Sequence, residues 1–159
     1  MNRRTQSGQT LIEVIIALGL IVMVLITLVA ALTLGFRNNQ TAKEETLAKD
    51  RVREAIEWIR QLRTSMGWDA FYSMVNNDGS TVTYCLDTLP TSVAAAQALT
   101  NGQCGNLQPL SGTTNFYRDM TLTIVGTNAD EIDVTVTVSW SSGGKNHDST
   151  STLNIKKWL

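Results

Sequence analysis

One apolar stretch near the start of the chain most constrains what this sequence can fold into. Residues 14–34 are apolar apart from two threonines and a glycine, and the only charge between Arg4 and Arg37 is Glu13. As a helix rising about 1.5 Å per residue, the stretch spans about 30 Å, the thickness of a bilayer's hydrocarbon core. Because Arg3 and Arg4 precede it, we expect a cytoplasmic N-terminus, with the rest of the chain facing outward.

Three interpretations of this stretch compete. A secretory signal peptide has an apolar region of only about 7–15 residues that ends in a cleavage site, so this run is too long for one. A plain single-pass membrane-anchored envelope domain explains the run but not Glu13, except as a carboxylate that reaches the headgroup boundary. An ionisable group in a membrane segment costs roughly 2.5–3.5 kcal/mol and is usually paired and functional. The third interpretation takes Glu13 and the residues just before it, SGQTLI, as one unit with the apolar run.

The residues around the glutamate support that third interpretation. The stretch SGQTLIEVIIALGL resembles the N-terminus of type IV prepilins, a signature shared by pilins and type II secretion pseudopilins. The resemblance implies a leader peptide over residues 1–8, with Arg3 and Arg4 as its basic charge and Gly8 as its last residue. It also implies that a prepilin peptidase cleaves after Gly8 at the cytoplasmic face, and that the new first residue, Gln9, is N-methylated.

The same resemblance implies a partner for Glu13. Residues 9–36 would form a transmembrane and filament-core helix, in which Glu13 is the fifth residue and neutralises the α-amine of Gln9 in a neighbouring subunit. Two opposite charges attract strongly in a low-dielectric bundle, whereas either one alone is expensive. Gln9 stands where an aromatic residue or Met is common in the family. Many major pilins carry a proline within this helix, so the absence of proline before Phe36 favours a minor pilin or pseudopilin.

Residues 37–67 are expected to continue the helix outside the membrane, with one apolar stripe. Two candidate ion pairs lie on its solvent-exposed side, Glu45 with Lys49 and Arg53 with Glu57. The helix is expected to end at Gly67. The arginines of this segment alternate with acidic residues and the whole chain has a net charge of −1, so a solvated face is expected and nucleic acid is an unlikely partner. The stripe consists of Ala48, Val52, Ala55, Ile59, Leu62 and Met66.

Residues 68–159 are expected to form a globular β-rich domain. Apolar and polar residues alternate over 119–124 and 132–140, and a third run, STLNIKKWL, follows at 151–159. The turns between these runs are predicted at GTNADE and SSGGKNHD. A further strand is predicted at residues 81–86, TVTYCL. We therefore predict an α+β fold in which one long N-terminal helix packs on a small antiparallel β-meander, a pilin-like architecture.

A polar loop is expected over residues 87–115, with a helical turn at 93–99. Cys85 and Cys104 bracket most of it, either as a disulfide or as two free thiols. An even number of cysteines after a membrane segment fits an oxidising compartment. A disulfide closing a loop of about 20 residues would contribute roughly 3 kcal/mol.

The sequence offers little for catalysis. The single histidine, His147, stands in a Gly/Ser-rich turn, and no nucleophile elbow, phosphate loop or zinc-spaced cluster is present. Calcium is a weak alternative at residues 76–80 and 128–133, which hold oxygen ligands without the spacing of a known calcium loop. We expect no enzyme, no cofactor and no metal.

The function that follows is structural. We expect a minor pilin or pseudopilin of a type IV pilus-like or type II secretion filament, at first a single-pass inner-membrane protein and then part of an extracellular or periplasmic filament. Its expected partners are other pilin subunits, the prepilin peptidase, an assembly platform protein and the inner membrane. The alternative is a tip pilin whose 87–115 loop binds a surface or DNA, and a plain anchored envelope domain remains the third reading.

Overall fold

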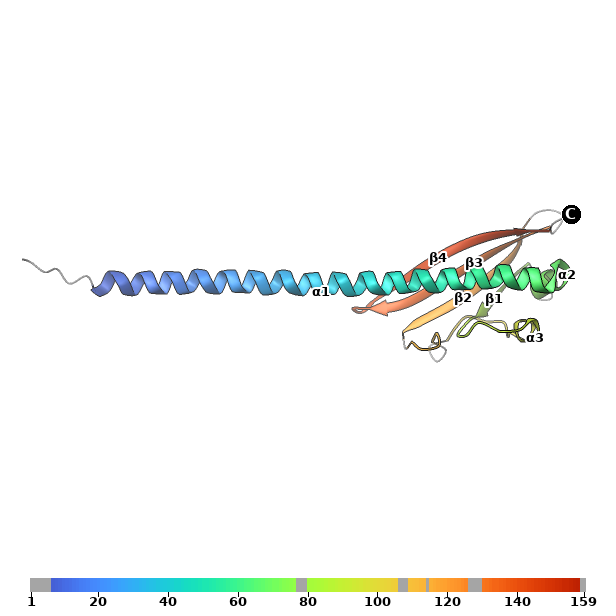
Figure 1. Ribbon diagram of the computed structural model, residues 1–159, viewed down its shortest axis with the longest axis horizontal. Helices are drawn as coiled ribbons and strands as arrows, with labels where there is room; N and C mark the ends of the chain where they lie inside the picture. The colour runs from blue at the N-terminus through green and yellow to red at the C-terminus, as the bar shows by residue number, and fades with distance from the viewer. Residues whose placement is uncertain (1–6, 77–79, 106–108, 114, 126–129, 158–159) are drawn as a thin grey trace, which may run out of the picture. The chain divides into compact units, whose positions relative to one another are not determined.

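The structure, a computed structural model, describes residues 7–76, 80–105, 109–113, 115–125 and 130–157, with side chains from Leu11 onward except that of Asn76. Two compact units divide the chain, residues 1–43 and residues 44–159, and the first helix contributes to both. The elements in chain order are α1 (Ser7–Met66), α2 (Trp68–Asn76), β1 (Thr81–Cys85), α3 (Val93–Gln97), β2 (Phe116–Val125), β3 (Glu131–Ser142) and β4 (Lys145–Lys156) (Figure 1).

The four strands form one antiparallel sheet in the order β1-β2-β3-β4, which confirms the predicted meander and the added strand at 81–86. The last hairpin is tighter than predicted. Ser142 pairs with Lys145, and only Gly143 and Gly144 separate β3 from β4. Their φ angles of 59° and 76° lie in the left-handed region that glycine adopts at little cost. Most of residues 141–148, predicted to be a turn, is therefore strand.

The core lies between the inner face of the sheet and the C-terminal part of α1. All five predicted stripe residues from Ala48 to Leu62 are buried, Met66 is half-buried, and the neighbouring Ile56 is buried as well. The opposing side chains come from alternate positions of β2 and β3, as the period-two pattern requires. They include Met120, Leu122, Ile132, Val134, Val136 and Val138. The α+β class with a long helix packed on a meander is thus confirmed.

A second helix follows the first directly, and the sequence analysis missed it. Gly67 ends α1 with a φ of 78°, and its N–H donates to the carbonyl of Arg63 at 3.1 Å. In α2, Phe71 and Val75 are buried and recur with the four-residue spacing of one helix face. The hydroxyl of Tyr84 in β1 donates to the carbonyl of Met74 at 2.7 Å, which fastens α2 to the sheet.

The exposed side of α1 within the second unit carries the expected ion pairs only in part. Lys49 donates to Glu45 at 2.6 Å, as predicted. Glu57 pairs with Arg60 at 3.0 Å, three residues ahead, rather than with Arg53 four residues behind. Both spacings bring side chains together on a helix surface, and such exposed pairs contribute only a few tenths of a kcal/mol.

Candidate functional site

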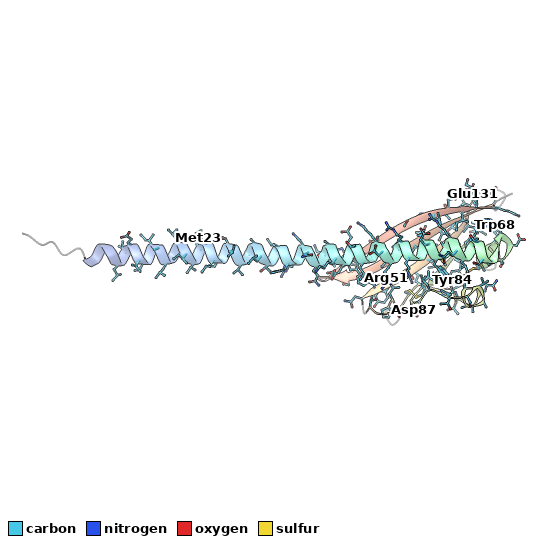
Figure 2. All side chains as sticks on the ribbon, viewed as in Figure 1. Met23, Arg51, Trp68, Tyr84, Asp87 and Glu131 are labelled. Carbon is cyan, nitrogen blue, oxygen red and sulfur yellow. A yellow bond between two sulfur atoms is a disulfide. The ribbon has the colours of Figure 1, made fainter. Side chains whose placement is uncertain are left out.

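The apolar segment of α1 has no cover within its own unit. Every side chain from residue 11 to residue 36 is exposed, and the large apolar ones keep between 53% and 73% of their surface accessible (Figure 2). By length and composition α1 is apolar enough to cross a membrane. A helix that is apolar on all sides must be buried in a bilayer or among other helices.

Glu13 stands on this uncovered segment and is itself exposed. The two threonine hydroxyls of the segment donate back to the helix, Thr27 to the carbonyl of Val24 and Thr33 to that of Val29, both at 2.8 Å. These groups are thereby satisfied within the helix. No described cation lies within ion-pair distance of Glu13 over the described part of the chain.

The remaining residues of the predicted processing site are placed only in outline. Gly8 and Gln9 lie in the first turns of α1, and nothing is described of their side chains. Arg3 and Arg4 lie outside the described residues. Gly8, Gln9 and Glu13 all belong to α1, and no contact among their side chains is described.

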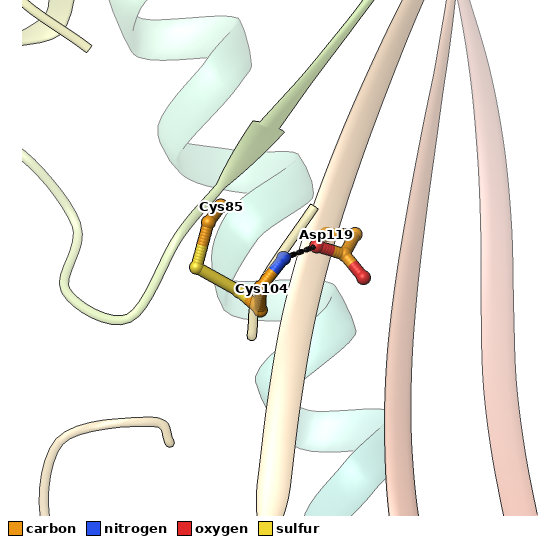
Figure 3. A group of neighbouring side chains, drawn as sticks. All are labelled: Cys85, Cys104 and Asp119. Atoms are coloured by element: carbon orange, nitrogen blue, oxygen red, sulfur yellow. Dashed lines mark hydrogen bonds between the residues drawn. A yellow bond between two sulfur atoms is a disulfide. The ribbon is translucent and has the colours of Figure 1, made fainter. Parts of the chain in front are cut away.

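In the second unit, the predicted cysteine pair is a disulfide. Cys85 ends β1 and bonds to Cys104, with the two Cα atoms 4.7 Å apart, which excludes the free-thiol alternative (Figure 3). Asp119 of β2 pairs with Cys85 across the strands and accepts the backbone N–H of Cys104 at 2.7 Å. Burial raises the pKa of Asp119, and the hydrogen bond from Cys104 opposes that rise.

Cys85, Cys104 and Asp119 bring two sulfurs and a carboxylate within 4.8 Å of one another, an arrangement that could suit a metal ion. The two sulfurs are bonded to each other, however, so neither is available as a thiolate ligand. The group is a disulfide and a hydrogen bond that together hold residue 104 against the outer face of the sheet.

Arg118 is the feature that sequence analysis did not anticipate. It lies on the inner face of β2 with only 2% of its surface exposed. Its Nε donates to the carbonyl of Leu86 at 3.1 Å, and its Nη1 donates to the carbonyl of Arg51 and to Glu54 Oε2, both at 3.2 Å. Burial lowers the pKa of Arg118, and the charge of Glu54 opposes that effect. The signal available was the period-two pattern, which continues through Phe116 and Arg118 before Met120.

The described part of the 87–115 segment is anchored at many points. The indole of Trp58 on α1 donates to the carbonyl of Pro90 at 2.8 Å, and the Gly102 N–H donates to the carbonyl of Thr83 at 2.8 Å. Helix α3 falls within the predicted helical turn and is capped by Ser92, whose hydroxyl accepts the Ala95 N–H at 3.2 Å. Further core contacts come from two buried residues, Ala96 and Leu110. The described residues of this segment are irregular apart from α3, as predicted, and they are nevertheless held against α1 and the sheet.

The two candidate calcium segments fall partly outside the described residues, at 77–79 and 128–129. In the second, Glu131 pairs with Lys156 at 2.5 Å, and Asp133 accepts the amide of Asn154 at 2.7 Å. The hydrogen bond from Lys156 lowers the pKa of Glu131. Both carboxylates therefore serve cross-strand pairs between β3 and β4.

Contrary to the prediction, His147 does not lie in a turn, and it is half-buried. It lies in β4 opposite Trp140 of β3, and the two rings stack with centroids 5.4 Å apart. Trp140 in turn stacks on Phe116 of β2 at 5.7 Å. This three-ring row packs one end of the sheet, and it gives His147 a structural role.

Comparison with known proteins adds no relatives: no protein-family model matches the chain, and no curated protein or solved structure shows significant similarity to it.

Proposed function

We propose that this protein is a structural subunit, a minor pilin or pseudopilin, of a type IV pilus-like or type II secretion filament. The observation that carries the proposal is the unpartnered carboxylate of Glu13 on a helix segment whose apolar side chains are exposed on every side. An isolated domain gains nothing from such a segment. A subunit that first waits in a bilayer and then packs among other subunits needs it in both states.

The energetics favour burial of the apolar segment by lipid at first and by neighbouring helices after assembly. Each large apolar side chain gains about 1.5–3 kcal/mol when it is fully buried, so the segment is held firmly by lipid or by neighbouring helices. Glu13 is the exception, because a buried carboxylate is tolerated only when it is paired. Cleavage after Gly8 would create an α-amine at Gln9, and the amine of one subunit could pair with Glu13 of the next.

The second unit supports this assignment in two ways. Residues 44–159 have their own core, and they carry a disulfide that suits a location outside the cytoplasm. Such a domain can be carried on the outside of a filament without taking part in its core. The inner membrane, a prepilin peptidase, an assembly platform protein and other pilin subunits are the partners that this function requires.

The first test is the mature N-terminus. Mass spectrometry of the protein from its native envelope should find a chain that begins at N-methylated Gln9. Recovery of a chain that keeps Arg3 and Arg4 in an assembled filament would overturn the proposal. A chain that keeps its leader and forms no filament would instead identify a plain membrane-anchored domain.

The second test is Glu13→Ala. We expect membrane insertion and leader cleavage to continue, and incorporation into filaments to fall at least tenfold, because the incoming amine would have no partner. Thr27→Ala is the matched control, since it also removes a polar group from the apolar segment but one already satisfied by its own helix. Unchanged incorporation of Glu13→Ala would contradict the role given to Glu13.

A further inference from the structure

Leu47 forms an apolar projection on the surface of the second unit. It keeps 37% of its surface exposed, whereas the other large apolar side chains described in residues 44–159 are buried or half-buried. Asp50 lies one turn further along the same side of α1, since positions three apart are neighbours on a helix surface. Asp50 is exposed and forms no ion pair with the described residues. We call these two residues the Leu47 knob.

A groove on the other flank of α1 has the complementary shape. It has a volume of about 440 Å³ and lies between α1 and β4. Its apolar floor is formed by Ile155 and by Leu153, which is only half-buried. Arg63 lines the same groove and stands 16 positions after Leu47, which at 3.6 residues per turn places the two about 160° apart around the helix. The knob and the groove therefore face opposite sides of the unit.

Arg63 gives this groove a positive charge that no described carboxylate neutralises. Its guanidinium lies over the ring of Trp68, with Cζ 5.9 Å from the ring centroid, and its Nη2 donates to the carbonyl of Lys156 at 3.4 Å. No described carboxylate lies within ion-pair distance of it. The ammonium of Lys156, by contrast, is already paired with Glu131. Arg63 is thus held in place, and its charge complements that of Asp50.

The two surfaces also match in their order along the helix. Glu45 interacts electrostatically with His147 near the start of β4, and Arg63 contacts Lys156 at its end, so β4 and α1 run in the same direction. The groove therefore presents its apolar floor first and its arginine after it. The knob presents its leucine first and its carboxylate after it. Two copies with parallel α1 helices can make both contacts at once.

We propose that the Leu47 knob of one copy docks into this groove of a second copy, with the two α1 helices parallel. Leu47 then covers Leu153 and Ile155, and Asp50 forms an ion pair with Arg63. Because 13 positions separate Asp50 from Arg63, the two copies are offset by about 20 Å along the helix, at 1.5 Å per residue. Parallel helices keep the apolar segments of both copies pointing the same way, as subunits drawn from one membrane require.

This contact rests on the proposed filament function and specifies one of its interfaces. The knob and the groove are different surfaces, so the contact is head-to-tail, and such contacts build open helical filaments when their rotation does not close a ring. Two copies at the same depth in a membrane are not offset, so the contact forms only after one copy has moved outward relative to the other. A chain that carries both surfaces can follow itself in the body of a filament, unlike a subunit confined to the tip.

Carbodiimide crosslinking of isolated filaments tests the ion pair, because the reagent joins a carboxylate to a lysine amine in contact with it. Arg63→Lys keeps the charge and supplies that amine. We expect mass spectrometry to find an amide between Asp50 and position 63, which lie about 20 Å apart on one helix, so that the link must join two copies. Ser65→Lys is the matched control, since exposed Ser65 stands 18 positions, or five full turns, after Leu47 and therefore on the flank of the knob. We expect at least tenfold less link to Asp50 from it.

Two further variants complete the test. Asp50→Lys combined with Arg63→Glu exchanges the charges and should give the same link. Leu47→Gln in the Arg63→Lys background should lower its yield at least fivefold, while near-ultraviolet circular dichroism shows the fold retained. Filaments without the link, or an equal link from Ser65→Lys, would overturn this contact and leave the proposed function standing. Absence of filaments from the wild-type chain would overturn both.

Discussion

Arg118 gives the sharpest prediction about the fold, because its replacement by methionine has two opposing effects. Methionine removes a guanidinium that is 2% exposed, and so removes the cost of burying a charge. It also removes the three hydrogen bonds that join β2 to Leu86, Arg51 and Glu54. Which effect is larger depends on what happens to each of the three acceptors.

The three acceptors differ in whether they still have a hydrogen-bond donor or solvent contact once Arg118 is replaced. The side chain of Glu54 keeps 46% of its surface exposed and also pairs with Arg51 at 3.1 Å, so it stays solvated and paired. The Arg51 carbonyl lies inside α1, where the helix itself supplies a donor. The carbonyl of Leu86 has no such substitute in a residue that is fully buried. An orphaned buried carbonyl costs about 1–3 kcal/mol.

We therefore expect Arg118→Met to lower the free energy of unfolding by about 1–3 kcal/mol, or roughly 5–15 °C in Tm for a domain of this size. Thermal unfolding of the full chain in detergent, followed by near-ultraviolet circular dichroism, would measure the change. Backbone amide hydrogen exchange should increase first around Leu86, just before the 87–115 segment. Arg60→Met is the control, because its pair with Glu57 is exposed and should cost less than about 0.5 kcal/mol. If Arg118→Met proved as stable as the wild type or more stable, the relief of the desolvation cost would match or exceed the loss of the hydrogen bonds, and this reasoning would be wrong.

Two further predictions concern the disulfide and its neighbour. Replacing Cys85 and Cys104 together by serine should lower the free energy of unfolding by about 3 kcal/mol, as measured by urea denaturation, because the bond closes a loop with a sequence separation of 19. Asp119→Asn should be more stable than the wild type at pH 7, because burial raises the folded-state pKa of Asp119 and so penalises its charged form, while an asparagine oxygen can still accept the Cys104 N–H. The stability gap should shrink as the pH falls through that raised pKa, since protonation then removes the same charge from the wild type; a gap that widened on acidification would contradict it.

Local periodicity accounts for the parts of the fold that could be predicted from sequence. The alternation around Val134 and Val136 reflects strands with one buried face, and the stripe from Ala48 to Leu62 reflects a helix with one buried side. The end of α1 at Gly67 was predictable because few other residues adopt its backbone conformation without strain. Helix α2 was predictable in principle, since Phe71 and Val75 have the spacing of one helix face.

The missed features depend on contacts between residues far apart in the chain. Arg118 reads as an exposed arginine, because charged residues are rarely fully buried, and its partners Leu86 and Glu54 are 32 and 64 residues away. His147 was assigned to a turn because the glycines before it suggested a longer loop than the two-residue hairpin that forms. The cysteine pairing was predictable because only one pairing exists for two cysteines, whereas the contact with Asp119 required knowledge of the strand register.

Two ionisable groups in apolar surroundings link these observations to the proposed function. Arg118 is buried, and the chain itself supplies three acceptors and an opposing charge, so this buried charge is compensated within the second unit. Glu13 stands in an apolar stretch for which the described residues supply neither a cover nor a cation. A sequence that satisfies one such group so thoroughly has no physical reason to keep the other unsatisfied unless its partner comes from another molecule. This contrast is the reason for proposing that neighbouring subunits complete Glu13 and the helix that carries it.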